Sequence, residues 1–366
     1  MPPELKPVAF RPTRKRTLYM AEPSSMQTDV VRQHTVPRFL LEHFGSSGKK
    51  KKHRKQLFAF DKESGRVFAT NVNDATVRNT FYNFDNHPEH LSLEPMLCQY
   101  EGRAASVITK ILQKKSLSIL SQVERHDLAM FTAIQQMRTH NQHEQIKHIS
   151  HSFKKKLLEM GLFEQWVDEF SLSPDTELED VLQIIAGDAS EAKGMFLEML
   201  SDQHIEADVL MQKDWHLLET TLDDPFYISD NPVSLFNGIS HPGRGNLGLA
   251  LEGIEIYLPL SSTITLAMIC PSLGENVRQE RAVIQHCIVN NIRVNGHNLF
   301  DELERVNELL EGDVIRVDSA RVEHLNWLQT GRAEQYIYCQ TDNFDLVRKI
   351  LTESPVLKTG PRMTVS

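Results

Sequence analysis

Residues 255–270, EIYLPLSSTITLAMIC, are the stretch that decides the fold. Their two apolar segments, Glu255–Leu260 and Thr263–Cys270, predict buried β-strands, because each is a short, nearly continuous apolar run. The longest apolar runs of the chain also lie here, over Ile254–Leu260 and Ile264–Pro271. Both are far shorter than the roughly 20 residues of a membrane helix, so we expect no membrane span.

Upstream of these strands the pattern changes twice. Leu57–Asp61 and Arg66–Thr70 are β-rich segments around a turn-like Lys-Glu-Ser-Gly, which predicts a hairpin. From about residue 94 to 210 the apolar residues recur mainly at helical spacing. Trp215–Glu219 and Phe226–Pro232 then open the second strand-rich block.

Downstream of residue 270 the sequence predicts helices again. They cover about Gln279–Val294, Leu299–Glu311 and Ala320–Cys339, with a helical tail to about Thr352. A β-hairpin, then helices, then strands and then helices is the order of an α+β protein. The expected organisation is a flexible basic tail over 1–26, a single domain over 27–352 with a helical insertion over about 94–210, and a C-terminal tail over 353–366.

Charge is distributed unevenly along the chain. The formal net charge is −9, yet residues 1–55 hold 13 Lys or Arg against 4 Asp or Glu. A basic cluster over Lys49–Lys55 follows Gly45–Gly48 and predicts a solvated loop. RNA or DNA is the natural partner of such a loop, because each neutralised phosphate releases a counterion. The substrate-binding candidates here are Lys50, Lys51, Lys52 and Arg54. A loop that only aids solubility is the alternative interpretation.

The four cysteines point to a reducing compartment. They are widely scattered and form no CxxC pair, which argues against a zinc knuckle and against a disulfide framework. The N-terminal MPPELKPVAFRPTRKR has no apolar core after its charges, unlike a secretory signal. We therefore expect a cytoplasmic protein.

Several phrases, taken in order, resemble one protein family. They are His34-x-Val36-Pro37-Arg38-Phe39-Leu40, Phe81-Tyr82, Gln135-x-x-Arg138-Thr139, Phe226-x-Ile228-Ser229-Asp230-Asn231-Pro232-Val233, Leu258-Pro259-Leu260-Ser261 and Leu325-Asn326. Over about residues 30–340 the chain resembles a bacterial family known as a domain of unknown function, DUF4238. The family pattern implies a proline after Arg138-Thr139, where this chain has His140. The resemblance implies no established activity, and it suggests a toxin or phage-defence setting.

His34 and Arg38 are the first candidate site residues. His34 precedes Val36-Pro37, whose stiff backbone suits the presentation of a catalytic or ligand-binding imidazole. The alternative is a histidine that anchors the chain start through one hydrogen bond. Arg38 could clamp a phosphate or carboxylate with two hydrogen bonds, or form a buried structural salt bridge to an acid such as Glu101.

Ser229-Asp230-Asn231-Pro232 follows an apolar strand, where polar side chains project into a crevice. A carboxylate and an amide could hold a metal-bound water or a ribose, and Asp230 and Asn231 are therefore catalytic candidates. The competing explanation is an Asx turn, in which Asp230 or Asn231 bonds its own backbone.

Gln135, Arg138 and Thr139 lie at i, i+3 and i+4 of a predicted helix and so face one side. Such a polar face suits substrate binding in a cavity, or else it is simply solvated. Arg138 and His143 also fit the Arg-x4-His pattern of helical ribonucleases, in which Arg steadies a phosphate and His moves a proton.

Metal binding through this histidine-rich region is not expected from the spacing alone. His140 and His143 are three residues apart, His143 and His148 are five apart, and there is no HExxH frame. No GxGxxG motif directly follows a strand, no GxSxG motif occurs, and the glycine-rich loop over Gly238–Gly248 is not a P-loop.

The first functional hypothesis is a nucleic-acid-acting enzyme, a nuclease-like effector. A metal-dependent version would use Mg²⁺ held by Asp230 with an acid such as Glu101. A metal-free version would use His34 as the base and an arginine to stabilise charge. The second hypothesis is a non-catalytic protein that senses a nucleotide or phosphorylated ligand, and the third is a plain interaction module.

Overall fold

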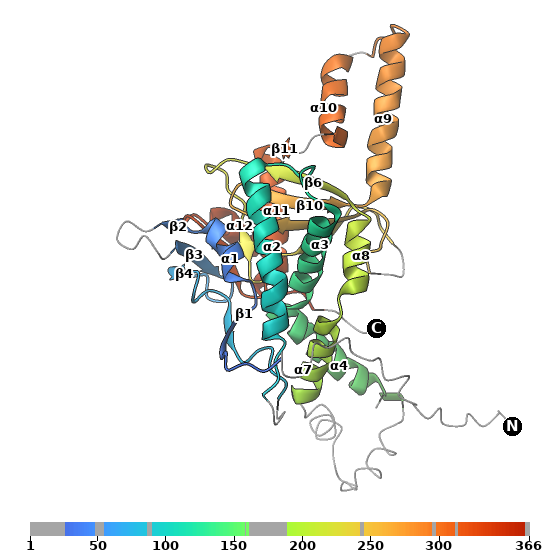
Figure 1. Cartoon of the computed structure of the whole chain (residues 1–366). Coiled ribbons are helices and arrows are strands. Elements are labelled where there is room, and N and C mark those ends of the chain that lie inside the picture. The colour runs from blue at the N-terminus through green and yellow to red at the C-terminus, as the bar shows by residue number, and fades with distance from the viewer. Residues whose placement is uncertain are drawn as a thin grey trace, which may run out of the picture.

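The structure is a computed structural model that describes residues 26–47, 55–85, 90–157, 159–160, 189–241, 245–294, 298–311 and 314–362. Strands near the N-terminus are followed by a helical region, a second group of strands and further helices (Figure 1). This order confirms the α+β class.

One five-stranded sheet forms the centre of the molecule. Its strand order is β11-β6-β10-β9-β8, and only the β11–β6 pair is parallel. The strands cover Asp214–Glu219 (β6), Ser234–Asn237 (β8), Ile254–Pro259 (β9), Ile264–Ile269 (β10) and Val314–Arg316 (β11). The two strands that were predicted from residues 255–270 are thus β9 and β10, paired in antiparallel register through Ala267 and Tyr257.

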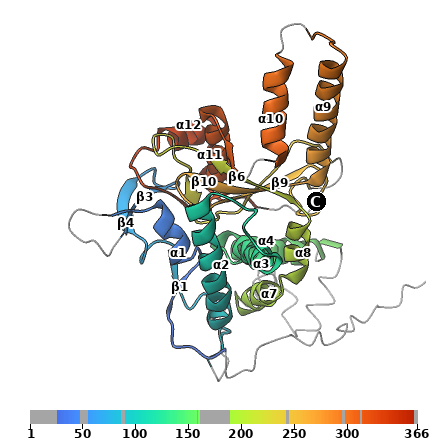
Figure 2. The same cartoon turned by 45° about the horizontal axis from the view of Figure 1, so that its top comes forward.

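Both faces of this sheet are covered by helices (Figure 2). Leu217, Leu266 and Met268 belong to the large core, together with the buried residues of the helices α2, α3 and α8. The opposite face contributes Leu218 and Ala267 to a second core with α11. The bounds of these helices are Glu94–Lys114 (α2), Gln122–Met137 (α3), His204–Met211 (α8) and Ser319–Arg332 (α11). A sheet covered on both sides explains the continuous apolar pattern of its strands.

A second five-stranded sheet joins the two ends of the chain. The predicted hairpin is confirmed, because β3 (Lys55–Asp61) pairs with β4 (Val67–Asn71) in antiparallel register. Sheet order is β2-β3-β12-β7, with β4 also on β3. The other strands are β2 (Ser46–Ser47), β7 (Ile228–Ser229) and β12 (Tyr336–Cys339).

The N-terminal part contains two further small elements. β1 (Arg32–His34) pairs with β5 (Val77–Asn79) as a two-stranded sheet. α1 (Arg38–Leu41) begins directly after Pro37 and continues as a 3₁₀ turn over Glu42–Phe44.

The helical region continues beyond α2 and α3. α3 begins at a capping box, in which Ser121 and Glu124 satisfy each other's backbone N–H groups. Arg138 ends this helix, and α4 (His140–Leu157) follows after one residue and packs on α7 (Ala189–Ser201).

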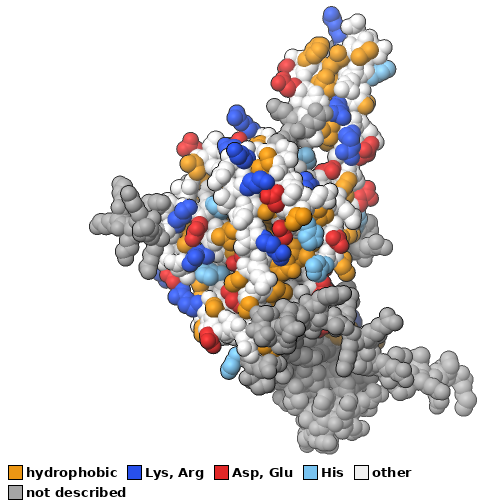
Figure 3. Space-filling view, viewed as in Figure 1, with side chains coloured by type: hydrophobic (Ala, Val, Ile, Leu, Met, Phe, Trp, Pro, Cys, Tyr) orange, Lys and Arg blue, Asp and Glu red, His pale blue; other side chains and the backbone are white. Residues whose placement is uncertain are grey.

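A helical hairpin of α9 (Pro271–Val289) and α10 (Leu299–Glu311) stands off the body of the protein (Figures 1 and 2). Apolar side chains lie on its surface (Figure 3). α9 begins eight residues before the predicted start, because Pro271 occupies its first turn directly after β10.

The C-terminal prediction of one helix over Ala320–Cys339 is wrong. α11 ends at Arg332, and Tyr336–Cys339 is the strand β12 between β3 and β7. The aromatic and β-branched Tyr-Ile-Tyr favours a strand, and pairing on both sides satisfies its backbone. α12 (Asp345–Glu353) and a 3₁₀ turn over Pro355–Lys358 follow.

The C-terminal segment differs from the expected tail. Arg362 forms an ion pair with Glu334, and Asn141 donates to the carbonyl oxygen of Pro361.

Among the described residues, no helix has both the length and the apolar character needed to span a membrane.

Candidate functional site

The family phrases near the N-terminus and at the end of α3 form one buried contact. The Gln135 amide donates to the carbonyl oxygen of Thr35 at 3.0 Å. The Arg138 guanidinium donates to the carbonyl oxygen of His34 at 2.6 Å, to Glu101 at 2.5 Å and to the Tyr82 hydroxyl at 3.2 Å. The Arg138 side chain is 1% exposed. These contacts hold the chain before α1 against α3, so the Gln-Arg face is neither solvated nor open to a cavity.

His34 and Arg38 lie in different environments. The His34 ring hydrogen-bonds the carbonyl oxygen of Ala75 through Nδ1 at 3.1 Å, and burial lowers its pKa. This is the anchoring contact that was considered as the alternative to catalysis. Arg38 is 61% exposed and lies 3.6 Å from Glu42. The buried salt bridge to Glu101 that was considered for Arg38 is instead made by Arg138.

The Ser-Asp-Asn-Pro segment is fixed by α11. Gln329 accepts from the backbone and hydroxyl groups of Ser229 and donates to Pro232. Asn326 accepts from the Tyr227 N–H and donates to Pro225. Side-chain hydrogen bonds therefore join the segment Phe226–Val233 to the part of α11 that contains Leu325-Asn326, and the two form one unit.

Asp230 is buried within this unit. Its carboxylate accepts three backbone N–H groups at 2.7–2.9 Å, from Glu334, Gln335 and Tyr336. Burial raises its pKa, and these three hydrogen bonds act in the opposite direction. Instead of the Asx turn considered as the competing explanation, the Asp230 carboxylate makes a contact that holds the start of β12.

Both groups of phrases meet at the junction between α3 and α4. Asn231 donates to Asn141 at 3.2 Å and to the carbonyl oxygen of Arg332 at 3.1 Å. Asn141 lies three residues after Arg138, in the first turn of α4. Thr139 is fully buried, and its hydroxyl accepts the Gln142 N–H at 3.4 Å. The contacts at this junction therefore fix the first turn of α4 and the side chains that it carries.

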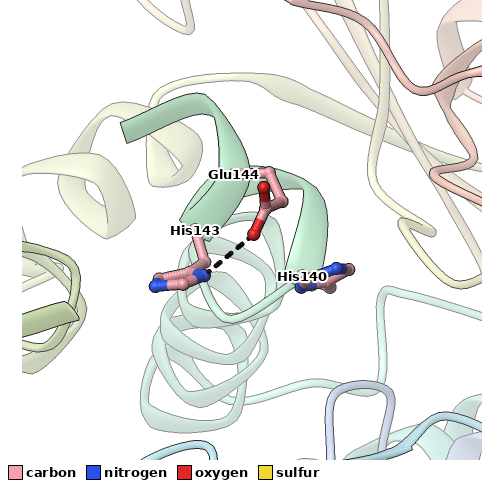
Figure 4. A group of neighbouring side chains, drawn as sticks. All are labelled: His140, His143 and Glu144. Carbon is pink, nitrogen blue, oxygen red and sulfur yellow. Dashed lines mark ion pairs between the residues drawn. The ribbon is translucent and has the colours of Figure 1, made fainter. Parts of the chain in front are cut away.

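His140, His143 and Glu144 are those next side chains. They lie at i, i+3 and i+4 of the first turn of α4 (Figure 4). One ligand atom from each of them lies within 4.8 Å of the others. Two imidazoles and a carboxylate form the donor set of a catalytic zinc site, which leaves a fourth position open. The spacing alone had argued against this cluster, so the structure revises that expectation.

Several nitrogen atoms of the cluster have no hydrogen-bond partner among the described residues. They are His140 Nδ1 and both ring nitrogens of His143, all of them buried. Glu144 lies 3.5 Å from His143 Nδ1, at ion-pair distance. Burial, with the nearby Arg78, lowers the pKa of His140 to about 4, and the adjacent His143 imidazole lowers that of Glu144 to about 2. A neutral imidazole and an ionised carboxylate are the forms that bind a metal.

Arg78 lies beside the cluster in a cavity of about 500 Å³. It is carried by β5, and the residues on both sides of that strand, Thr76 and Thr80, have positive φ of 59° and 48°. Such a backbone is strained for a β-branched residue, and strain of this kind often accompanies function. Within the described ranges, Arg78 forms no hydrogen bond or ion pair through its guanidinium. Lys193 lines the same cavity but is paired with Asp85 at 2.5 Å.

A second cavity of about 260 Å³ adjoins the first. Arg78 and His140 line both of them, and Asp230, Tyr336 and Tyr338 line the second. The structure therefore brings Asp230 to the same hollow as His140. Arg138 and Gln135 lie behind this surface, and Lys50, Lys51, Lys52 and Arg54 fall outside the described residues.

Sequence reasoning missed the role of Glu144. Histidine pairs at i, i+4 were considered, without the combination of two histidines and a carboxylate. A His-x-x-His-Glu pattern on a helix places all three groups on neighbouring positions of one turn. This combination was the sequence signal that could have identified the cluster.

The fold and this site define an α+β protein with a candidate metal centre on a helix start. A family model described as "Protein of unknown function (DUF4238)" matches residues 32–343, and the chain belongs to that family. His140 is not one of the residues that carry the family resemblance. No curated protein and no solved structure shows a match to the chain.

Proposed function

We propose that this protein is a metal-dependent phosphodiesterase that acts on nucleic acid. His140, His143 and Glu144 hold the metal, and Arg78 binds the phosphate to be cleaved. The observation that carries the proposal is the close approach of three metal-ligand atoms beside an unpaired arginine in one cavity.

The donor set favours zinc or a similar transition metal. Imidazole nitrogen is a better ligand for zinc than for Mg²⁺, which prefers oxygen. A transition metal therefore replaces Mg²⁺ held by Asp230 and Glu101 in the proposed mechanism. Glu101 is paired with Arg138, and the Asp230 oxygens accept three N–H groups, so neither carboxylate is available for a metal. A metal with an open position supplies a water of lowered pKa close to the bound phosphate.

Arg78 suits the phosphate role for two reasons. Its planar guanidinium matches two phosphate oxygens, and no carboxylate within the described part of the chain competes for it. Hydrolysis adds water at phosphorus, breaks one P–O ester bond and returns a proton to the leaving oxygen. The negative charge that develops on the phosphoryl oxygens would be stabilised by Arg78.

The nucleic-acid class of the substrate rests on charge. Residues 1–55 carry a large excess of basic residues on a chain whose net charge is −9. A basic segment on an acidic protein attracts a polyphosphate more strongly than a single phosphate, and this attraction falls with salt. A role as a toxin or defence effector belongs to the same proposal and rests on the family resemblance.

The test is cleavage of end-labelled RNA and DNA by the full chain after EDTA treatment and after addition of Zn²⁺, Mn²⁺ or Mg²⁺. The expected result is cleavage that needs Zn²⁺ or Mn²⁺ and falls at least about 100-fold in His143→Ala and Arg78→Gln. Bound metal is measured in parallel by mass spectrometry. Arg78→Gln should keep the metal, whereas His143→Ala should lose it.

His151→Ala is the matched control, because His151 is exposed on the same helix. Its cleavage and metal content should equal those of the wild type. Metal binding without cleavage would show a structural metal site and would refute the phosphodiesterase. Cleavage that persists in EDTA would refute the metal mechanism.

A further inference from the structure

A larger cavity lies at the base of the α9–α10 hairpin, away from the metal cluster. Its volume is about 920 Å³, which is within the range of small-molecule sites. The floor is the central sheet, the roof is the first part of α9 with the end of α10, and α11 closes one side. Its lining residues and those of the two cavities at α4 do not overlap.

The cavity is positively charged on an acidic protein. Six basic side chains line it against three acidic ones, and the basic residues are Arg125, Lys213, Arg278, Arg305, Arg316 and Arg321. Four of these six already have carboxylate partners, as in the pairs of Arg321 with Glu255 and of Arg305 with Glu280.

Arg125 and Lys213 differ from the other four. Lys213 is only 7% exposed, and Arg125 is half-buried with its guanidinium 4.4 Å from the centre of the Trp215 ring. Across the described ranges, neither forms an ion pair. Burial lowers the pKa of both side chains, and the carboxylate of Asp214 acts in the opposite direction on Arg125. A partly buried cation without an ion pair is costly, and an anionic ligand would compensate it.

The rest of the lining suits an uncharged part of an anionic ligand. Leu218, Ala267 and Ile269 provide an apolar floor, and Val277 faces them from α9. His216 Nδ1 is buried in the lining, and no residue of the described ranges forms a hydrogen bond with it. The site thus offers cations, an apolar surface and an unsatisfied polar nitrogen.

We propose that this cavity binds a nucleoside phosphate, with its phosphates at Arg125 and Lys213 and its base on the apolar floor near His216. A nucleoside phosphate combines an anionic end, an apolar body and a hydrogen-bonding edge, and it fits the volume. This inference does not depend on the metal centre.

The test is isothermal titration of the full chain with ADP, adenosine and inorganic phosphate. ADP should bind more tightly than either of its parts, because only ADP reaches both regions of the cavity. Lys213→Met and Arg125→Gln should each weaken ADP binding about tenfold or more.

The ligand-free melting temperature provides a second readout. Lys213→Met should raise it, because the substitution removes an unpaired buried charge. A lysine that serves only the fold would lower it instead. Higher stability together with weaker binding is the signature of a residue kept for a ligand.

Arg103→Gln is the matched control. Arg103 also lies over an aromatic ring, at 4.7 Å from the centre of Tyr100, but it has Asp127 as a partner and lies outside the cavity lining. ADP affinity should be unchanged in this variant. Absence of ADP binding to the wild type, equal affinity for adenosine or phosphate alone, or equal ADP affinity in Lys213→Met and Arg125→Gln would each overturn the proposal.

Discussion

Lys62 and Asp230 hold the turn between α11 and β12 from opposite sides. The Lys62 ammonium donates to the carbonyl oxygen of Thr330 in the last turn of α11 at 2.9 Å and to that of Ala333, the residue after the helix, at 2.6 Å. The Asp230 carboxylate accepts the N–H groups that come next in the chain. Burial lowers the pKa of Lys62 to about 8, so it stays charged at neutral pH. The two buried charges therefore satisfy a turn that has few backbone partners of its own.

Asp230→Asn should destabilise the protein by about 2–4 kcal/mol, because an amide replaces one acceptor oxygen with a donor that faces N–H groups. The measurement is urea unfolding at pH 7. Lys62→Met and the double variant complete a cycle, in which we expect a coupling energy of about 0.5–3 kcal/mol. Additive effects would show that the two charges act independently of each other.

Arg138→Ala should lower the free energy of unfolding by about 3–5 kcal/mol, because it leaves Glu101 without its partner. Adding Glu101→Gln to this variant should restore part of the loss. The measurement is chemical denaturation of the three variants. Arg138→Ala with wild-type stability and lost activity would place Arg138 in a substrate site instead.

Because of Glu94, we expect the free energy of unfolding to depend on pH. Burial raises its pKa to about 7, and Oε2 has no hydrogen-bond partner in the described part of the chain. Between the ordinary pKa of a glutamate and about pH 7, Glu94 is protonated in the folded state and ionised in the unfolded state. Its contribution to stability is therefore greatest at acidic pH. It is lost as pH rises to about 7, with a fall of about 1–3 kcal/mol.

Glu94→Gln tests this directly. Its free energy of unfolding, relative to the wild type, should be higher at pH 8 than at pH 5.5. Glu63→Gln, at an exposed position, is the control and should show no such difference. A wild-type pH profile in Glu94→Gln would show that another group carries the effect.

Metal binding should stabilise the fold. Zn²⁺ added to EDTA-treated protein at about 100 times its dissociation constant contributes about 2.7 kcal/mol and should raise the melting temperature. The shift should disappear in His140→Ala and persist in His151→Ala. Equal shifts in all variants would place the zinc elsewhere.

Much of the fold follows from local pattern. The residues of α10 have a clear helical period and those of β9 and β10 form short apolar runs with defined ends, and the structure places all three within about one residue of the prediction. β12 was missed, because only three residues separate it from α11 and Gly331, in the last turn of that helix, is also compatible with a helix that continues. Its strand conformation depends on β3 and β7, which are remote in sequence, and a local pattern contains no such partner.

The candidate site was less accessible from the sequence. Polar residues such as Arg138 and Asp230 stand out in a sequence whether they bind a ligand or the backbone of a distant segment. The structure shows backbone partners for both, at His34 for Arg138 and in the turn before β12 for Asp230. Arg78, by contrast, has no local signal, and its importance comes from the cavity that it shares with His140.

The position of β12 has a consequence for synthesis of the protein. β3 lies near the start of the chain, and one of its neighbours in the sheet comes from residues 336–339. While the ribosome is still making the middle of the chain, the edge of β3 that β12 will cover remains open to other strands. A messenger truncated before that point would therefore yield a chain with an uncapped sheet, which makes it a target for chaperones and proteases.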